Sequence, residues 1–286
     1  MEHQQSSVSA QQSWRPTSRN EIDNIPDTVV LFESQWAGGK VVFDPSRNVV
    51  WKYTHDLTEE LQAAKFAKDV VGIPGPQIFH HAPIPSPRPD LSYWDRPKVW
   101  YICMEKCPGV PLISVLESMT DDELDIVARQ MREILQKMAT VKSSTLGNVN
   151  GGPLCNPFFG WQHSPPRAFQ SCSEFIDYFR RLLTPVIGSR DIEAILQHMP
   201  IDDDIHFVHG DLLPQNIMVE GTRITAVIDW CTAGFYPAYW EYCTMHNPHS
   251  ITPGWDKLLR RVFPEPHRKA EIVSVNNLII QVLNQL

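Results

Sequence analysis

The polar segment 209–216, which reads His-Gly-Asp-Leu-Leu-Pro-Gln-Asn, constrains the fold of this chain more than any other feature. An apolar pair before it predicts a short buried strand, and the residues after it predict two strands joined by a tight turn. Such a hairpin returns the chain, so that Asp229, thirteen residues beyond Asn216, comes to lie beside the segment. Asp211, Asn216 and Asp229 are therefore predicted to converge.

Two carboxylates and an amide at one point can handle both a metal ion and a proton. Asp229 is a hard-oxygen ligand suited to Mg²⁺, and Asn216 offers a second oxygen. Asp211 is then the base that accepts the proton of a hydroxyl group. Phosphoryl transfer from ATP uses this division of labour, so ATP and Mg²⁺ are the predicted cofactors. The alternative is a polar turn in an ordinary hairpin.

The pattern His-Gly-Asp-x-x-x-x-Asn, followed by Ile-Asp-Trp, resembles the aminoglycoside phosphotransferase and choline kinase family, which shares the protein-kinase fold. The continuation at 233–242 resembles fungal members of that family in particular. With gaps, the resemblance runs from about Val41 to about Glu241. It implies an α+β, bilobal protein-kinase-like fold, with an antiparallel sheet and one helix in the N-lobe and a mainly helical C-lobe.

Three regions are expected along the chain. Residues 1–24 are rich in Gln, Ser and Arg and are predicted to be disordered or loosely docked. Residues 25–107 are expected to form the N-lobe, whose sheet covers the nucleotide, and residues 108–286 the C-lobe with the catalytic loop and the substrate site. Predicted strands lie at 29–33, 41–44, 49–53 and 99–104, a proline-rich loop at 83–97, a capping box at Thr120-x-x-Glu123, and helices at 59–71, 124–138, 174–183, 255–263 and 270–286.

Lys52 lies in a predicted inner strand, where an ammonium group stays charged at little cost only beside an anion. The resemblance implies that this lysine holds the α- and β-phosphates of ATP; the alternative is an edge-strand lysine directed to water. In the family a glutamate of the next helix pairs with the lysine, and Gln62 occupies its position here. Because Gln62 carries no charge, Glu59, three residues earlier on the same helical face, is a candidate substitute.

Two further segments are candidates for nucleotide binding through the same resemblance. The turn with Gly38 and Gly39 lies between the first two strands, where kinases cover the phosphates, although Gly-x-Gly-x-x-Gly is absent. An ordinary hairpin turn is the alternative. The turn from Glu105 to Cys107 resembles the hinge, whose backbone pairs with the adenine edge.

The acceptor is predicted to be a hydroxyl group of a small molecule. Gly210 stands where protein kinases have an arginine that clamps a phosphorylated activation loop. Glu241 lies only twelve positions after Asp229, and no Ala-Pro-Glu follows, which leaves little room for a peptide platform. The competing hypothesis, favoured by Gln62, is a catalytically weakened or inactive kinase-like protein that binds a nucleotide.

Composition limits the partners and the location. A net charge of −8 makes nucleic acid a poor partner. The sequence has no apolar run long enough for a signal peptide or a membrane span, so no membrane association is expected. Six scattered cysteines without a Cys-x-x-Cys pair favour reduced thiols and a cytoplasmic location. No obligatory protein partner is evident.

Overall fold

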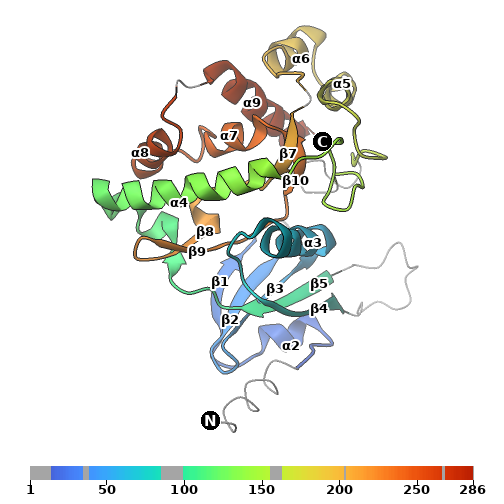
Figure 1. Cartoon of the computed structure of the whole chain (residues 1–286). Coiled ribbons are helices and arrows are strands. Elements are labelled where there is room, and N and C mark those ends of the chain that lie inside the picture. Colours follow the sequence, from blue (N-terminus) through green and yellow to red (C-terminus); the bar gives the residue numbers. More distant parts are fainter. Residues whose placement is uncertain are drawn as a thin grey trace, which may run out of the picture. The chain divides into compact units, whose positions relative to one another are not determined.

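The computed structural model describes residues 14–34, 39–84, 99–154, 163–202, 204–265 and 268–285 (Figure 1). The chain forms two compact units, and each has its own hydrophobic core. Unit 1 comprises Met1–Thr58 and Pro76–Cys107, and unit 2 comprises Glu59–Gly75 and Pro108–Leu286.

Unit 1 is built on a five-stranded antiparallel sheet. Its strands follow the order β1-β2-β3-β5-β4, where β1 is Val29–Glu33, β2 Lys40–Asp44, β3 Val49–His55, β4 Ile78–Ile84 and β5 Val99–Glu105. β-branched and aromatic residues dominate β3 and β5, as in strands that pack against a core. The strands predicted in this region are therefore confirmed. The proline-rich stretch continues from the edge strand β4 into residues 85–98, which lie outside the described part of the chain.

The segment expected to be disordered or loosely docked, 1–24, is described from Trp14 onward, and this part packs against the sheet. It contains the short helix α2 (Arg19–Asp23), whose N-cap is Ser18. Ile22 of α2 is fully buried in the core of unit 1. The expectation is corrected for these residues, because a few apolar side chains anchor a segment whose average composition is polar.

The helix predicted at 59–71 is present as α3 (Thr58–Phe66), which continues into a π-helical turn (Ala67–Val71). From its second residue onward it belongs to unit 2, whereas the resemblance implied one helix in the N-lobe with the sheet. Packing is the cause, since apolar residues of the helix and the turn share a core cluster with the later part of the chain. In addition, Lys137 Nζ donates a hydrogen bond to Gly72 O at 2.9 Å.

Unit 2 is mainly helical in its described part, as predicted. Its further helices are α4 (Asp121–Thr140), α5 (Cys172–Leu183), α6 (Ser189–Leu196), α7 (Trp240–Met245), α8 (Pro253–Val262) and α9 (Lys269–Gln285). The predicted capping box of Thr120 and Glu123 forms at the start of α4, which crosses unit 2 in green in Figure 1. Leu124, Val127 and Met131 recur at helical spacing on α4 and are buried.

Two small antiparallel sheets complete unit 2. One pairs β7 (Ile205–Val208) with β10 (Gly234–Pro237), and the other has the order β6-β8-β9, where β6 is Val110–Pro111, β8 Ile217–Glu220 and β9 Arg223–Val227. The predicted β8–β9 hairpin is thus present. Gln130 of α4 holds its turn, because its amide nitrogen donates to Thr222 O at 2.7 Å and its amide oxygen accepts from Ile224 N at 3.0 Å.

Aromatic rings pack beneath the loop that joins β7 to β8. Phe207 of β7 stacks on Trp230, with ring centroids 5.7 Å apart, and meets Phe66 of α3 edge-on at 5.0 Å. Strands and helices together make an α+β protein, which confirms the predicted class. Within the described ranges, no helix combines the length and the apolar character needed to span a membrane.

Candidate functional site

The polar segment 209–216 forms the loop between β7 and β8, and its side chains tie the loop together. His209 Nδ1 accepts a hydrogen bond from Asp211 N at 3.1 Å, so its Nε2 carries the proton and donates to Ile228 O at 3.0 Å. Asn216 is buried at the end of the loop. Its amide nitrogen donates to Asp211 O and to Asp211 Oδ2, at 2.9 Å each.

Asp229 follows β9 and reaches the same loop. The N–H of Ile228 donates to Asn216 O at 2.9 Å, which brings the two chain segments side by side. Asp229 itself has a left-handed φ of 64°, an uncommon conformation for a residue other than glycine. Asp211, Asn216 and Asp229 therefore lie together in unit 2. Their catalytic and metal-binding roles stay predictions.

Asp211 has the environment of a base that works near neutral pH. Burial, and next the negative charge of Asp229, raise the pKa of Asp211 to about 7, while the hydrogen bond from Asn216 acts in the opposite direction. Its carboxyl group is therefore partly protonated at pH 7. Ordinary aspartates are fully ionised at this pH.

The donor set fits a divalent cation such as Mg²⁺. Two neighbouring carboxylates repel each other, and a cation between them would relieve the repulsion. Mg²⁺ typically takes one or two carboxylates from a protein and fills its other positions with water and phosphate oxygens. Among the residues that the structure describes, no three His, Cys, Asp or Glu side chains are arranged to hold a metal by themselves. Asp229 with the amide oxygen of Asn216 matches the smaller requirement of Mg²⁺.

Glu241 of α7 binds the first two residues of the loop, a role that the sequence does not predict. Its carboxylate accepts hydrogen bonds from His209 N at 2.5 Å and from Gly210 N at 3.2 Å. Burial raises the pKa of Glu241 to about 7, against the lowering effect of these backbone hydrogen bonds. The signal in the sequence is a single acid within the largely apolar stretch 239–245, because an acid is rarely buried without partners.

Gly210 is required by the backbone of the same loop. Its φ is 82°, and a Cβ at this position would lie 2.9 Å from Thr232 O. Thr232 also donates from its hydroxyl group to His209 O at 2.9 Å. The glycine that replaces the arginine of protein kinases thus has a structural reason here.

Glu59 and Gln62 lie on one face of α3, three residues apart, and both bond to the loop that follows α4. Glu59 Oε1 accepts a hydrogen bond from Asn148 Nδ2 at 3.1 Å, and Gln62 Oε1 accepts one from Asn150 Nδ2 at 2.5 Å. Asn148 is buried, and its own oxygen accepts from Gly152 N at 2.9 Å. The two asparagines have no recognisable motif in the sequence and are contacts that sequence reasoning missed.

Lys52 lies in the middle of β3, opposite Val41 of β2 and Ile102 of β5. Its neighbours Trp51 and Tyr53 are buried in the core that contains α2. Because side chains alternate along a strand, Lys52 points to the other face of the sheet. An inner strand therefore carries this lysine, and the alternative of an edge-strand lysine is wrong.

The other candidates in unit 1 lie at two turns. Gly39 directly precedes β2, and Gly38 lies outside the described residues. Glu105 ends β5; its N–H donates to Gln77 O at 2.8 Å, and its carboxylate accepts from Gln77 N at 3.0 Å. Cys107 is half-buried, forms no disulfide and lies at the end of unit 1.

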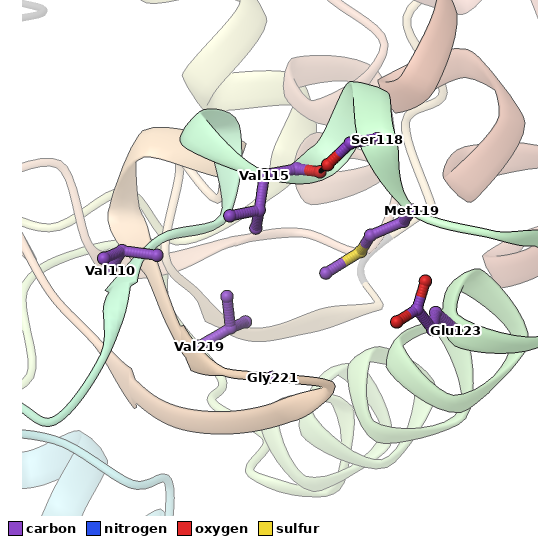
Figure 2. Close-up of a pocket in the computed structure, with 7 residues that line it drawn as sticks. All are labelled: Val110, Val115, Ser118, Met119, Glu123, Val219 and Gly221. Carbon is purple, nitrogen blue, oxygen red and sulfur yellow. Dashed lines mark hydrogen bonds between the residues drawn. The ribbon is translucent and has the colours of Figure 1, made fainter.

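One pocket in unit 2, of about 250 Å³, lies apart from all these residues (Figure 2). Apolar side chains from the segment after β6 and from β8 face one another across it, and the carboxylate of Glu123 stands at its side. It contains none of the predicted site residues. The lining consists of Val110, Val115, Ser118, Met119, Glu123, Val219 and Gly221.

Solved structures of phosphotransferases resemble more than nine-tenths of the chain. Aminoglycoside phosphotransferase APH(4)-Ia matches with a TM-score of 0.62 and 16% identity over 93% of this chain and 89% of that one. The GDP and kanamycin complex of an APH(2")-III enzyme matches with a TM-score of 0.58 and 16% identity, over 91% and 85%. A choline/ethanolamine kinase family protein from Mesorhizobium loti matches with a TM-score of 0.51 and 13% identity, over 98% and 83%.

At these identities the likeness shows the fold, and it confirms the predicted protein-kinase-like α+β fold. None of the curated proteins matches the chain. The model of the phosphotransferase enzyme family (APH) matches residues 53–271, which include the loop of Asp211, the hairpin and Glu241. The predicted resemblance and the prediction of a phosphotransferase are thereby confirmed. The chain belongs to the phosphotransferase enzyme family.

Proposed function

We propose that this protein moves the γ-phosphate of ATP to a hydroxyl group of a small molecule, in a reaction that depends on Mg²⁺. The observation that carries the proposal is the hydrogen bond from the Asn216 amide to the Asp211 carboxylate, with the charge of Asp229 beside it. Phosphoryl transfer needs positioning and charge neutralisation more than covalent chemistry. A similar structure that contains ADP and hygromycin B supports the same reaction class.

Asp211 would be the catalytic base. Its pKa of about 7 leaves part of its carboxyl group ionised at neutral pH and able to accept the proton of the attacking hydroxyl. The hydrogen bond from Asn216 fixes the orientation of the carboxylate, and His209 holds the backbone N–H of Asp211. Such a base typically contributes about 10² to 10⁴ in rate.

Asp229 and Asn216 would hold the metal. Because the nitrogen of the Asn216 amide donates to Asp211, its oxygen is the side-chain atom that remains for a cation. When bound, Mg²⁺ would neutralise the charge on the β- and γ-phosphate oxygens.

The nucleotide would bind the residues of unit 1. Lys52 would hold the α- and β-phosphates from β3, with Glu59 or Gln62 as its partner, and the turn of Gly38 and Gly39 would cover the phosphates. Val41 and Ile102 lie opposite Lys52 on the two adjoining strands. Their apolar side chains suit contact with the adenosine moiety. The backbone from Glu105 to Cys107 would pair with the adenine edge.

The acceptor would be a small alcohol or aminocyclitol rather than a peptide. Between Asp229 and Glu241 the chain forms β10 and the start of α7, which leaves only short connecting segments in this stretch. Similar structures contain hygromycin B or kanamycin, which are small hydroxyl-bearing molecules. A cytoplasmic location belongs to the proposal, and the described cysteines, which form no disulfides, are consistent with it.

The test is a screen of small hydroxyl compounds with ATP and Mg²⁺, in which mass spectrometry measures the gain of one phosphate. Asp211→Asn and Asp229→Ala should abolish the transfer while the proteins still melt cooperatively. Asp202→Asn, a change at an exposed acid of the same unit, should keep full activity. Transfer at the wild-type level in both site variants would refute the assignment.

A nucleotide-binding protein without catalysis is the second candidate. It is favoured by Gln62, whose uncharged amide is already bonded to Asn150. Stabilisation of the wild-type protein by Mg-ATP, without phosphate transfer to any compound, would support this candidate.

A further inference from the structure

Residues 14–25, here called the strap, cover the face of the unit 1 sheet opposite to Lys52. The strap places Trp14 edge-on against Trp51, with ring centroids 5.1 Å apart, and buries Ile22. Tyr53, on the other side of Lys52, is buried in the same core. The two residues that flank Lys52 in β3 are therefore both held by the strap.

Asp23 of α2 is the polar centre of this contact. Its Oδ1 accepts a hydrogen bond from the phenol of Tyr53 and another from Lys40 Nζ, the latter at 3.1 Å. Its Oδ2 lies 3.7 Å from Arg19 Nε, and the guanidinium of Arg19 lies over the Tyr53 ring at 4.7 Å. Burial, together with the hydrogen bond to Asp23, raises the pKa of Tyr53 to about 12. One carboxylate thus links α2 to two strands.

The two strand residues held by Asp23 adjoin the two proposed phosphate contacts. Lys40 and Tyr53 are opposite each other in the β2–β3 ladder. Lys40 directly follows Gly39, whose carbonyl accepts a hydrogen bond from Ser34 N at 2.8 Å. Tyr53 directly follows Lys52.

We propose that Asp23 is a positioning residue for phosphate binding, which fixes the glycine turn through Lys40 and the strand of Lys52 through Tyr53. The inference rests on the proposed function, because it takes Lys52 and the turn at Gly39 as phosphate contacts. It predicts that loss of the Asp23 carboxylate lowers the affinity for the phosphate groups and leaves the affinity for adenosine unchanged. A role limited to folding would weaken both alike.

We expect Asp23→Ala to have a moderate effect on the affinity for Mg-ATP. The side chain of Asp23 is 30% exposed and that of Lys40 16%, so water screens part of their attraction. The hydrogen bond from the Tyr53 phenol to a carboxylate is stronger than one between neutral groups. For Asp23→Ala we expect the Kd of Mg-ATP to rise about three- to tenfold.

The experiment compares the Kd of Mg-ATP with that of adenosine by calorimetry, and the KM for ATP with kcat. Asp23→Ala should raise the Kd and the KM of the triphosphate and leave the Kd of adenosine and kcat unchanged. Asp23→Asn keeps an acceptor oxygen and should recover part of the loss. Glu21→Ala is the matched control, since this carboxylate of the same helix accepts its hydrogen bonds from Thr17. It should bind Mg-ATP like the wild type.

If Asp23→Ala does not fold, Tyr53→Phe is tested in its place. This change removes the hydrogen bond from the Tyr53 phenol to Asp23 and keeps the ion pair of Asp23 with Lys40. We again expect a raised Kd for Mg-ATP and an unchanged Kd for adenosine. Unchanged Mg-ATP binding in these variants, or equal weakening for adenosine, would overturn the inference and leave the proposed function standing. A wild-type protein that binds no Mg-ATP would overturn both.

Discussion

Glu241 Oε2 accepts the backbone N–H of His209 at 2.5 Å, although the two residues are 32 positions apart in the sequence. The same carboxylate accepts from Gly210 N, so it holds the start of the loop that carries Asp211. This buried acid therefore holds the start of the loop that is proposed to be catalytic.

Glu241→Ala should therefore lower kcat about 10- to 100-fold, because the loop loses its anchor and a 1 Å displacement at a site can cost about 10²-fold in rate. The free energy of unfolding should fall by about 1 to 3 kcal/mol, since two backbone N–H groups lose their buried acceptor. Activity assays and urea titrations measure the two effects. Glu220→Ala, an exposed acid of the same unit, should change neither quantity. A Glu241→Ala protein with wild-type kcat would show that the loop keeps its geometry unaided.

Asp211 should make the free protein less stable as the pH rises. Its pKa is about 7 in the folded chain, whereas an unfolded aspartate titrates near 3.9. Between these values the folded state binds more protons than the unfolded state, so its contribution to stability is present at low pH and is lost as the pH rises through about 7. Asp211→Asn removes this loss and keeps an oxygen for the bond from Asn216.

Without Mg²⁺, we expect Asp211→Asn to match the wild type below pH 4 and to exceed its unfolding free energy by about 1 to 3 kcal/mol at pH 8. The charge of Asp211 also contributes to the raised pKa of Glu241, so its removal in Asp211→Asn acts in the same direction at pH 8. Urea denaturation at the two pH values measures the effect, with the exposed change Asp69→Asn as control. Equal stability at pH 8 would mean that neither burial nor the charge of Asp229 raises the pKa of Asp211 in solution.

Elements with a local signal could be predicted from the sequence. The β8–β9 hairpin follows from apolar runs on both sides of Gly221, and α4 follows from its capping box and its 3.6-residue stripe. The convergence of Asp211 and Asn216 follows from the same local pattern, because the two residues are only five positions apart. In each case a short stretch of chain holds the whole signal.

Features that depend on distant contacts could not be predicted in this way. The N-cap residue of α6 is Gly188 and that of α7 is Tyr239, and neither makes a side-chain hydrogen bond that would mark the start of its helix. The place of α3 in unit 2 depends on its packing against residues much later in the chain. The bonds of Asn148 to Glu59 and of Glu241 to His209 are likewise invisible before the fold is known.

Glu59 is the charged residue of α3 proposed to support Lys52, so its charge should matter for ATP. Glu59→Gln keeps an oxygen for the bond from Asn148 and removes only the charge. We expect kcat/KM for ATP to fall about 3- to 30-fold, the scale of one partly screened ion pair. Adding Gln62→Glu to this variant returns a carboxylate to the same helical face and should restore part of the loss. If Glu59→Gln leaves kcat/KM for ATP unchanged, and turnover appears only in a Gln62→Glu protein, the second candidate is favoured. That candidate is a nucleotide-binding protein without catalysis.

Gly109 directly precedes β6, and its backbone lies close to that of β8. Its φ is 86°, and a Cβ there would lie 1.9 Å from Val219 O, which is backbone and cannot give way as a side chain would. Gly221 also has a left-handed φ, 60°, but a Cβ there would meet no atom within 4 Å. Both substitutions by alanine carry the conformational cost of about 1 to 2 kcal/mol, and only Gly109→Ala adds the clash with β8. We expect Gly109→Ala to lose about 3 kcal/mol or more in urea denaturation and Gly221→Ala about half as much. Equal losses in the two variants would mean that β6 moves away from β8 at little cost.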